Sequence, residues 1–258
     1  EGIDGDHPEV YMDSRPLDAE LEAITRAGNL AAYADCPLHI VHISSGSGAR
    51  EAARIDETRD VPVTLETCPH YLAFSKDDVA EQGPFLKVNP SLKSDAERER
   101  LWEAVADGTI DLVASEHFPT YRANREKGWE DIWEPYAGLP TIETTLEFLA
   151  SAGVHEGRIS WARLQDLLCE TPAAVAGLAG RKGTIEEGAD ADLVLLRETD
   201  WTVSADDLAY NGNWTPFEGR ELSAKVDTVI SGGEVASEGH EVRADPGDGE
   251  FLPRGPAY

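Results

Sequence analysis

The segment 110–120 places two residues that can do acid–base or metal chemistry directly after an apolar run. Residues 110–115 read Ile-Asp-Leu-Val-Ala-Ser and predict a β-strand. Glu116 and His117 come next, and Pro119 prevents the strand from continuing. A carboxylate and an imidazole at the C-terminal end of a strand are typical of catalytic α/β barrels, which hold their chemistry at that end.

Two other apolar runs also end at a histidine. His42 lies within the run 37–43, and His70 follows the run 61–67, as His117 follows the third. Neutral imidazole is the commonest metal ligand, and hydrolytic metal sites combine it with carboxylates while keeping a position for water. The residues alone therefore favour a shared metal site, with buried structural histidines and a solvated loop start as the alternatives.

Helices are expected between these strands. Residues 17–33 predict an amphipathic helix, and residues 94–107 predict another, with Ser94 as its N-cap and Glu97 completing a capping box. A Ser/Gly-rich loop at 44–48 precedes a further helix. Alternation of helices with strands that are apolar on both faces is typical of a parallel sheet covered by helices, so we expect an α/β fold.

The pattern of predicted helices and strands changes towards the C-terminus of the chain. Residues 121–140 predict a long, aromatic-rich loop that could serve as a lid, and helical stretches follow up to residue 178. From Gly183 on, turns and short strands indicate a small β module. We therefore expect a barrel-type region over residues 1–180 and a β region over residues 181–258.

The composition is strongly acidic. The 258 residues carry a net charge of -28, with 6 lysines against 16 arginines. Acids spread along the whole chain indicate a halophilic surface, and they disfavour nucleic acid as a partner because nothing neutralises phosphates. No signal peptide or membrane-length apolar run is visible, and three cysteines without a CxxC pair indicate a reducing, cytoplasmic location.

Six segments resemble motifs of the cyclic amidohydrolases, in that family's order and spacing. The segments are VHISS at 41–45, ETCPHYL at 66–72, NPSLK at 89–93, DLVASEH at 111–117, GTIEEGADADLV at 183–194 and TPFEGREL at 215–222. The family includes hydantoinase (dihydropyrimidinase), allantoinase and dihydroorotase. The resemblance implies a (β/α)8 TIM-like barrel with a small β-sandwich, and a site for two divalent metals.

By this resemblance, His42 is a metal ligand at the end of the sixth barrel strand. Glu116 takes the place of the family's catalytic aspartate, which binds one metal and carries the proton from the metal-bound hydroxide to the leaving nitrogen. The metals are usually Zn²⁺, with Mn²⁺ or Co²⁺ as alternatives. They are bridged by a carboxylated lysine, which we expect outside this chain.

The resemblance also assigns the surroundings of the site. Asn89, Ala137 and Gly138 lie in the two segments that touch a small cyclic amide substrate. His70 and His117 match family positions near the site that do not bind metal, which replaces the hypothesis of three histidine ligands.

The first half of the family's barrel has no counterpart in the sequence. A complete barrel needs about 250 residues by itself, so these 258 residues predict the C-terminal half of a barrel plus part of the sandwich. We expect a partner that supplies the N-terminal half, and a homo-oligomer in the whole protein. Without that half, an apolar sheet edge would be open to aggregation or pairing.

Two substitutions decide between hypotheses. Glu116 stands where the family has aspartate, and Thr120 stands where dihydroorotase would have a substrate-gripping histidine. Thr120 favours the allantoinase or hydantoinase side over dihydroorotase. The first hypothesis is a metal-dependent hydrolase that opens a cyclic amide ring. The alternative, raised by Glu116, is a non-catalytic scaffold or a decayed enzyme with the same fold.

Overall fold

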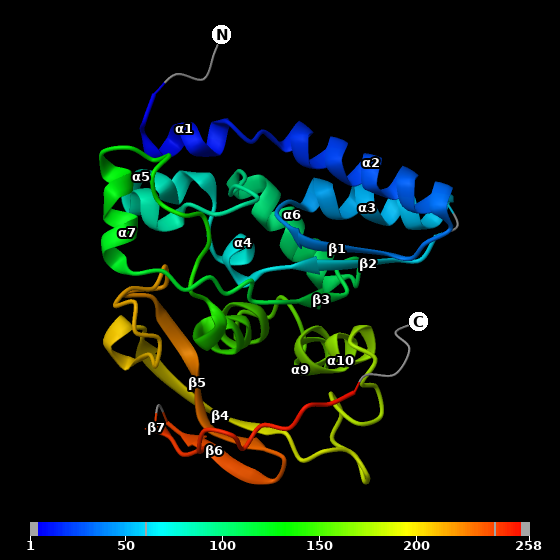
Figure 1. Cartoon of the computed structure of the whole chain (residues 1–258), viewed down its shortest axis with the longest axis vertical. Coiled ribbons are helices and arrows are strands. Elements are labelled where there is room, and N and C mark those ends of the chain that lie inside the picture. Colours follow the sequence, from blue (N-terminus) through cyan, green and yellow to red (C-terminus); the bar gives the residue numbers. More distant parts are fainter. Residues whose placement is uncertain (1–4, 60, 240, 254–258) are drawn as a thin grey trace. The chain divides into compact units, whose positions relative to one another are not determined.

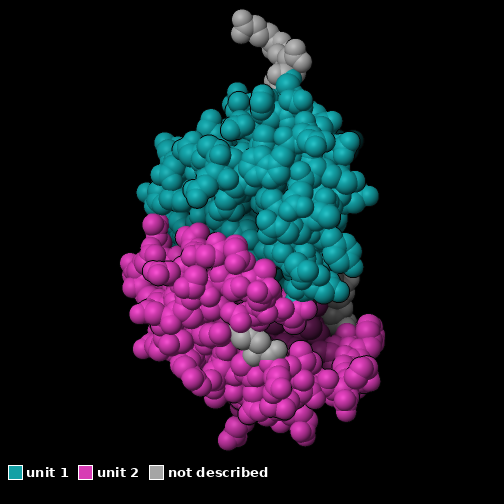
Figure 2. All heavy atoms as spheres, turned by 90° about the vertical axis from the view of Figure 1, so that its left-hand side faces the viewer, with its two compact units in different colours: residues 1–142, 210–216 teal, residues 143–209, 217–258 magenta. Residues whose placement is uncertain are grey.

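The computed structural model describes residues 5–59, 61–239 and 241–253 and divides the chain into two compact units, coloured separately in Figure 2. Unit 1 contains residues 1–142 and 210–216, and unit 2 contains residues 143–209 and 217–258. This grouping by contacts differs from the boundary expected after residue 180. The assignment of residues 1–180 to a barrel and 181–258 to a sandwich stays a prediction.

Unit 1 contains short parallel strands and several helices (Figure 1). Its elements, in order, are α1 (Pro8–Asp13), α2 (Leu17–Ala34), β1 (Leu38–Ile43), α3 (Gly46–Arg59), β2 (Val63–Thr67), α4 (Pro69–Ala73), the 3-10 helix η1 (Lys76–Asp78), α5 (Val79–Gln82), the 3-10 helix η2 (Gly83–Leu86), α6 (Asp95–Ala106), β3 (Leu112–Val113), α7 (Arg122–Glu126) and the 3-10 helix η3 (Lys127–Trp129). The 3-10 helix η4 (Ile142–Thr144) spans the boundary with unit 2.

The sheet of unit 1 is parallel, as its apolar strands predicted. Its order is β1-β2-β3, with His39 opposite Thr64 and Glu66 opposite Leu112. Helices α2 and α3 pack against β1, and α3 also packs against β2 and α6 (Figure 1). Because β1 to β3 are parallel and consecutive, their carboxyl ends lie at one edge, where the candidate residues follow.

Helix α3 begins earlier than expected, inside the Ser/Gly segment. Carboxylates from two other helices bind the start of α3: Glu20 accepts from Ser44 N, two residues before the helix, at 2.7 Å, and Glu97 accepts from Ser47 N in the first turn at 2.9 Å. Ser94 caps α6 as predicted. Glu97, however, directs its carboxylate to α3, so the capping box is only half formed. Negative charge beside the free N–H groups of a helix start stabilises it.

Strand β1 is an edge strand of this sheet, since it pairs with β2 and with no other named strand of the described residues. Its side chains Leu38, Ile40 and Val41 line a groove of about 540 Å³ that α2 forms with β1. Val41 is 38% exposed. An edge strand with exposed apolar side chains can accept another strand.

Unit 2 combines short helices with an antiparallel sheet of order β4-β5-β6-β7. Its elements are α8 (Thr145–Phe148), the π-helix η5 (Leu149–His155), α9 (Trp161–Gln165), the π-helix η6 (Asp166–Glu170), α10 (Thr171–Val175), β4 (Leu193–Thr202), the 3-10 helix η7 (Ala205–Asp207), β5 (Glu221–Ser231), β6 (Glu234–Glu238) and β7 (Glu241–Val242). The β module predicted from residue 183 onward is present, and β4 extends further than expected.

Side chains from α8 and η5 complete the hydrogen bonding of β5. Ser151 Oγ accepts from the main-chain nitrogens of Ser223 (3.0 Å) and Ala224 (3.2 Å), and Glu147 accepts from Val226 N at 2.8 Å. The named strand β6 pairs only with residues 228–231 of β5. These side chains therefore occupy β5 donors that the sheet leaves unpaired, which protects a strand edge.

Glu147 predicts a pH dependence of stability. It is buried, its Oε2 has no partner among the described residues, and burial raises the pKa of its carboxyl to about 7. A folded-state pKa above the unfolded value means that stability is lost as pH rises from about 4.5 to 7. Glu147→Gln keeps the bond to Val226 and cannot ionise. In denaturant titrations from pH 4 to 8, we expect the free energy of unfolding of the variant to rise by roughly 2–3 kcal/mol relative to that of the native chain as the pH increases. A constant difference across this range would contradict it.

The short helix α1 has Pro8 in its first turn, a position that suits proline. One other sequence expectation differs from the structure. The expected long loop at 121–140 contains α7 and η3. None of the helices within residues 5–59, 61–239 and 241–253 is both long and apolar enough to cross a membrane.

Candidate functional site

His42 and Glu116 share an unusual backbone conformation at the ends of β1 and β3. Their φ angles are +46° and +45°, and among the described residues only two other non-glycine residues, Asp35 and Asn213, have positive φ. The pairing of β1 with β2 is irregular between Ile40 and Ile43, which places His42 in a bulge. Left-handed backbone in non-glycine residues costs about 1–3 kcal/mol and concentrates at functional sites.

Asn89 and His42 line the same groove beside β1. Asn89 is held by a residue 78 positions away, because Tyr11 Oη donates to Asn89 Oδ1 at 2.6 Å. The guanidinium of Arg15 lies 3.9 Å from the centre of the Tyr11 ring. Tyr11 thus fixes a predicted substrate-binding residue, and no sequence motif singled it out.

Two buried cations hold the segment that contains Ala137 and Gly138. Lys87 Nζ donates to the carbonyls of Ile132 (2.7 Å) and Pro135 (2.5 Å), and Lys87 O accepts from Gly138 N at 3.0 Å. Burial lowers the pKa of Lys87 to about 8. Lys87 lies two residues before Asn89 in the sequence. Because its carbonyl binds Gly138, the two predicted substrate-binding segments are neighbours.

Arg125 is the second of these cations. Its Nη1 donates to Lys87 O at 3.1 Å and to Tyr136 O at 2.7 Å, and its guanidinium lies 4.8 Å from the centre of the Trp214 ring. Burial lowers its pKa to about 10. Sequence reasoning missed both cations, because Lys and Arg are almost never fully buried.

His117 positions the chain after Glu116. Its Nδ1 accepts from the main-chain nitrogens of Thr141 (3.2 Å) and Ile142 (3.3 Å), so this nitrogen carries no proton. The next residue, Phe118, donates its N–H to Leu139 O at 3.0 Å. The resemblance placed His117 near the site as a residue that does not bind metal, and its geometry is that of a loop anchor.

Thr120 is buried and held through its backbone by the segment 210–216, which returns to unit 1. Thr120 N donates to Tyr210 Oη at 2.8 Å, and Thr120 O accepts from Trp214 Nε1 at 2.6 Å. Its Oγ1 is buried without a partner among the described residues. Thr120 is therefore a buried and fixed part of the loop that follows Glu116.

His70 is buried in α4, the short helix that follows β2. It is 1% exposed, its ring lies 4.2 Å from that of Tyr71, and neither ring nitrogen has a partner in the described part of the chain. Burial lowers the pKa of His70 to about 3, and His42 adds to this effect. Burial also raises the pKa of the Cys68 thiol well above its usual value, with contributions from Glu66 and Glu116. Both groups stay neutral at pH 7.

Imidazole and carboxylate are donor groups that suit a divalent metal such as zinc, so His42 and Glu116 fit in chemistry. Across residues 5–59, 61–239 and 241–253, no three His, Cys, Asp or Glu side chains are grouped so as to hold a metal ion. The donor set of the described residues is therefore incomplete by itself, and the hypothesis of three histidine ligands is wrong.

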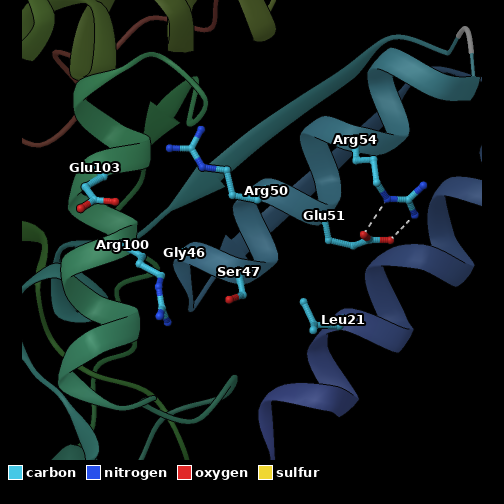
Figure 3. Close-up of a pocket in the computed structure, with 8 residues that line it drawn as sticks. All are labelled: Leu21, Gly46, Ser47, Arg50, Glu51, Arg54, Arg100 and Glu103. Atoms are coloured by element: carbon cyan, nitrogen blue, oxygen red, sulfur yellow. Dashed lines mark hydrogen bonds and ion pairs between the residues drawn. The ribbon is translucent and has the colours of Figure 1, made fainter.

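A separate pocket of about 400 Å³ lies among α2, α3 and α6 and is lined by three arginines (Figure 3). Arg54 pairs with Glu51 at 2.6 Å, Arg50 pairs with Asp107, and Arg100 pairs with Glu97. Each guanidinium already faces a carboxylate, so this pocket has the character of a salt-bridged surface.

A parallel sheet that brings chemistry-bearing side chains to the carboxyl ends of its strands is the arrangement of catalytic α/β barrels. The model of the amidohydrolase family matches residues 20–236, and the chain belongs to that family.

The chain is similar to L-hydantoinase of Paenarthrobacter aurescens, with 36% identity over 95% of this chain and 54% of that protein. It is also similar to a dihydroorotase of Halobacterium salinarum (40% identity; 86% and 50% covered) and an allantoinase of Rubrobacter xylanophilus (40%; 94% and 52%). The chain thus spans about half the length of the curated relatives it matches.

Solved structures agree with this placement. L-hydantoinase from Arthrobacter aurescens superposes with a TM-score of 0.93 at 33% identity, covering 97% of this chain and 55% of that one. D-hydantoinase from Thermus sp. gives 0.92 at 29% identity, covering 97% and 56%. The predicted fold class, part of a TIM-like amidohydrolase barrel together with part of a smaller β domain, is confirmed.

Proposed function

We propose that the protein containing this chain is a metal-dependent hydrolase that opens a cyclic amide ring of the hydantoin, allantoin or dihydropyrimidine type. The observation that carries the proposal is the pair of left-handed residues, His42 and Glu116, at the carboxyl ends of β1 and β3. The chain's amidohydrolase membership gives this pair its chemistry.

In this proposal, His42 and Glu116 hold divalent metal together with ligands from outside the described residues. When bound, the metal lowers the pKa of a water and polarises the ring carbonyl. Glu116 then accepts a proton at its carboxylate and returns it to the leaving ring nitrogen, which is general base and acid catalysis in turn. The main chain at Asn89 and at residues 137–138 orients the ring.

The groove beside β1 supports a second part of the proposal. The edge of β1 accepts a parallel strand from the N-terminal half that the relatives possess, and Leu38, Ile40 and Val41 become covered. A homo-oligomer, a halophilic surface and a cytoplasmic location stay predictions.

For the substrate, we propose hydantoins or allantoin in preference to dihydroorotate. Thr120 is buried and its backbone is bound by Tyr210 and Trp214, so it offers no cation to a substrate carboxylate. The relative named dihydroorotase is 40% identical, and dihydroorotate therefore belongs in every assay as a competing substrate.

Metal removal tests the proposal. We expect the protein in its full natural length, assayed in concentrated salt, to open at least one of these rings with Zn²⁺, Mn²⁺ or Co²⁺. Treatment with a chelator should abolish the activity because the polarising metal is lost, and added metal should restore it. Ring opening is followed by chromatography of the carbamoyl product. Full activity after complete metal removal, or no activity with any of the three metals, would contradict it.

A further inference from the structure

Glu66 is a buried carboxylate at the end of β2 that the proposed mechanism does not use. The residue is 7% exposed, and its Oε1 has no hydrogen-bond partner among the described residues. Its other oxygen, Oε2, lies 3.4 Å from His39 Nε2, and His39 Nδ1 lies 2.7 Å from Thr64 Oγ1. These three side chains share one face of the sheet, because His39 is opposite Thr64 and Glu66 is two positions further along β2.

Glu66 lies between the two proposed metal ligands. Leu65 pairs with Ile40 and Thr67 pairs with Ile43, so Glu66 lies opposite the bulge of β1 that contains His42. On the other side, Glu66 pairs with Leu112 of β3, the strand that Glu116 follows. Strand β2, which carries Glu66, pairs with β1 on one side and β3 on the other. The strand between the one that carries His42 and the one that Glu116 follows thus has a buried carboxylate one residue before its end.

A buried carboxylate with an unpaired oxygen is unfavourable unless something outside its immediate network uses it. The His39–Thr64 pair occupies only Oε2. The left-handed conformation of His42 must also be held in place, since its backbone is strained. A carboxylate on the strand opposite the bulge that contains His42 serves both needs.

We propose that Glu66 is a positioning residue that holds His42 and Glu116 in the geometry required for binding divalent metal. This inference rests on the proposed function, because it takes these two residues as metal ligands. Glu66 acts through the two strands that pair with β2, by holding the bulge at His42 and the end of β3 before Glu116, and it touches neither substrate nor metal. Groups that orient metal ligands typically change metal affinity by about 10–100-fold when they are replaced.

The experiment compares the full-length protein with its Glu66→Gln and Glu66→Asp variants. Zinc dissociation constants are measured by competition with a chromophoric chelator, and unfolding midpoints are measured on the same samples. We expect Glu66→Gln to bind zinc about 10–100-fold more weakly, with an unfolding midpoint close to that of the native protein. Glu66→Asp keeps the charge and should recover part of the affinity.

Glu97→Gln is the matched control. Glu97 is likewise a buried carboxylate, but it binds Ser47 in the first turn of α3 instead of lying opposite the bulge at His42. We expect this variant to bind zinc like the native protein even if its unfolding midpoint falls. If the role of Glu66 were purely structural, Glu66→Gln and Glu97→Gln would both lower the unfolding midpoint, and both would leave the zinc affinity unchanged.

The outcomes separate this inference from the proposed function. Zinc affinities within twofold of the native value in both Glu66 variants would overturn the inference, and so would a native protein that binds no zinc. A native protein that binds zinc through Glu66 but opens none of the tested rings would overturn the proposed function alone.

Discussion

Replacing Glu116 by glutamine in the full-length protein is expected to lower kcat/KM for ring opening by about 10²–10⁴-fold, the usual contribution of a general acid–base group. Glutamine has nearly the same shape and tolerates the same left-handed backbone, so the fold should be unchanged. It can neither accept a proton nor bind metal as an anion. Steady-state kinetics with the best substrate, together with metal content, measure the effect.

The control for this variant is Glu134→Gln, which removes an exposed carboxylate from the segment following η3. We expect its kinetics to match those of the native protein. A Glu116→Gln variant with kcat/KM within threefold of the native value would exclude Glu116 as the proton carrier.

Glu116→Asp separates the enzyme from the non-catalytic alternative. An enzyme that has adapted to the longer side chain should keep activity or lose some of it, because a displacement of about 1 Å can cost about 10²-fold in rate. Activity that appears only in the aspartate variant would mean that the natural protein is a scaffold or a decayed enzyme.

The second large effect is expected at Gly138. Its φ is +135°, and a Cβ atom there would lie 2.5 Å from Cβ of Phe118. Gly138→Ala must therefore displace Phe118, which follows Glu116 by two residues, or the segment 137–138. We expect kcat/KM to fall by about 10²-fold, since either shift moves groups that orient the substrate. Kinetics with one substrate, at saturating metal, measure the loss.

Gly108→Ala is the matched control for backbone strain. Gly108 also has positive φ (+90°), and nothing lies within 4 Å of its Cβ position. This variant should lose some stability and keep its kcat/KM. The double variant Gly138→Ala/Phe118→Gly should recover part of the activity, because it removes both Cβ and the ring of Phe118 from the clash. Equal losses from Gly108→Ala and Gly138→Ala would assign the effect to backbone strain alone.

The sequence predicted the parallel sheet well because its signals are local. Apolar runs at 37–43 and 61–67 became β1 and β2, and the helix expected at 17–33 became α2. Strand β3 shrank to Leu112–Val113 from the expected 110–115. The run Ile-Asp-Leu-Val-Ala-Ser has the apolar pattern of a strand. That pattern does not show how many of its residues pair with a neighbouring strand, and only Leu112 and Val113 pair with β2.

The contacts around the candidate site were less predictable because they join distant residues. The bond from Tyr11 to Asn89 and the carbonyls bound by Lys87 depend on chain reversals that no local pattern encodes. Glu97 fits the motif of a capping box, yet it binds Ser47 of another helix. Glu66 stands inside the motif ETCPHYL, and only burial and its unpaired oxygen single it out.

The roles of His42, Glu116, Asn89, Ala137 and Gly138 came from the family resemblance, and they stay predictions. The structure adds independent support at two of these positions, because φ near +45° at His42 and Glu116 does not follow from the sequence pattern. Side chains of both types usually avoid that conformation. This agreement is why the two residues, rather than the three histidines, carry the proposal.

The return of residues 210–216 to unit 1 has a consequence for biosynthesis. Trp214 is buried there, bonded to the carbonyl of Thr120, although residues 143–209 are translated before it. At about 5–20 residues per second, the ribosome needs several seconds between Ile142 and Trp214. During that interval unit 1 lacks one of its largest buried side chains and cannot complete its packing. A nascent chain arrested after Ile142 would expose this hole to chaperones and proteases, so unit 1 matures only after much of unit 2 has left the ribosome.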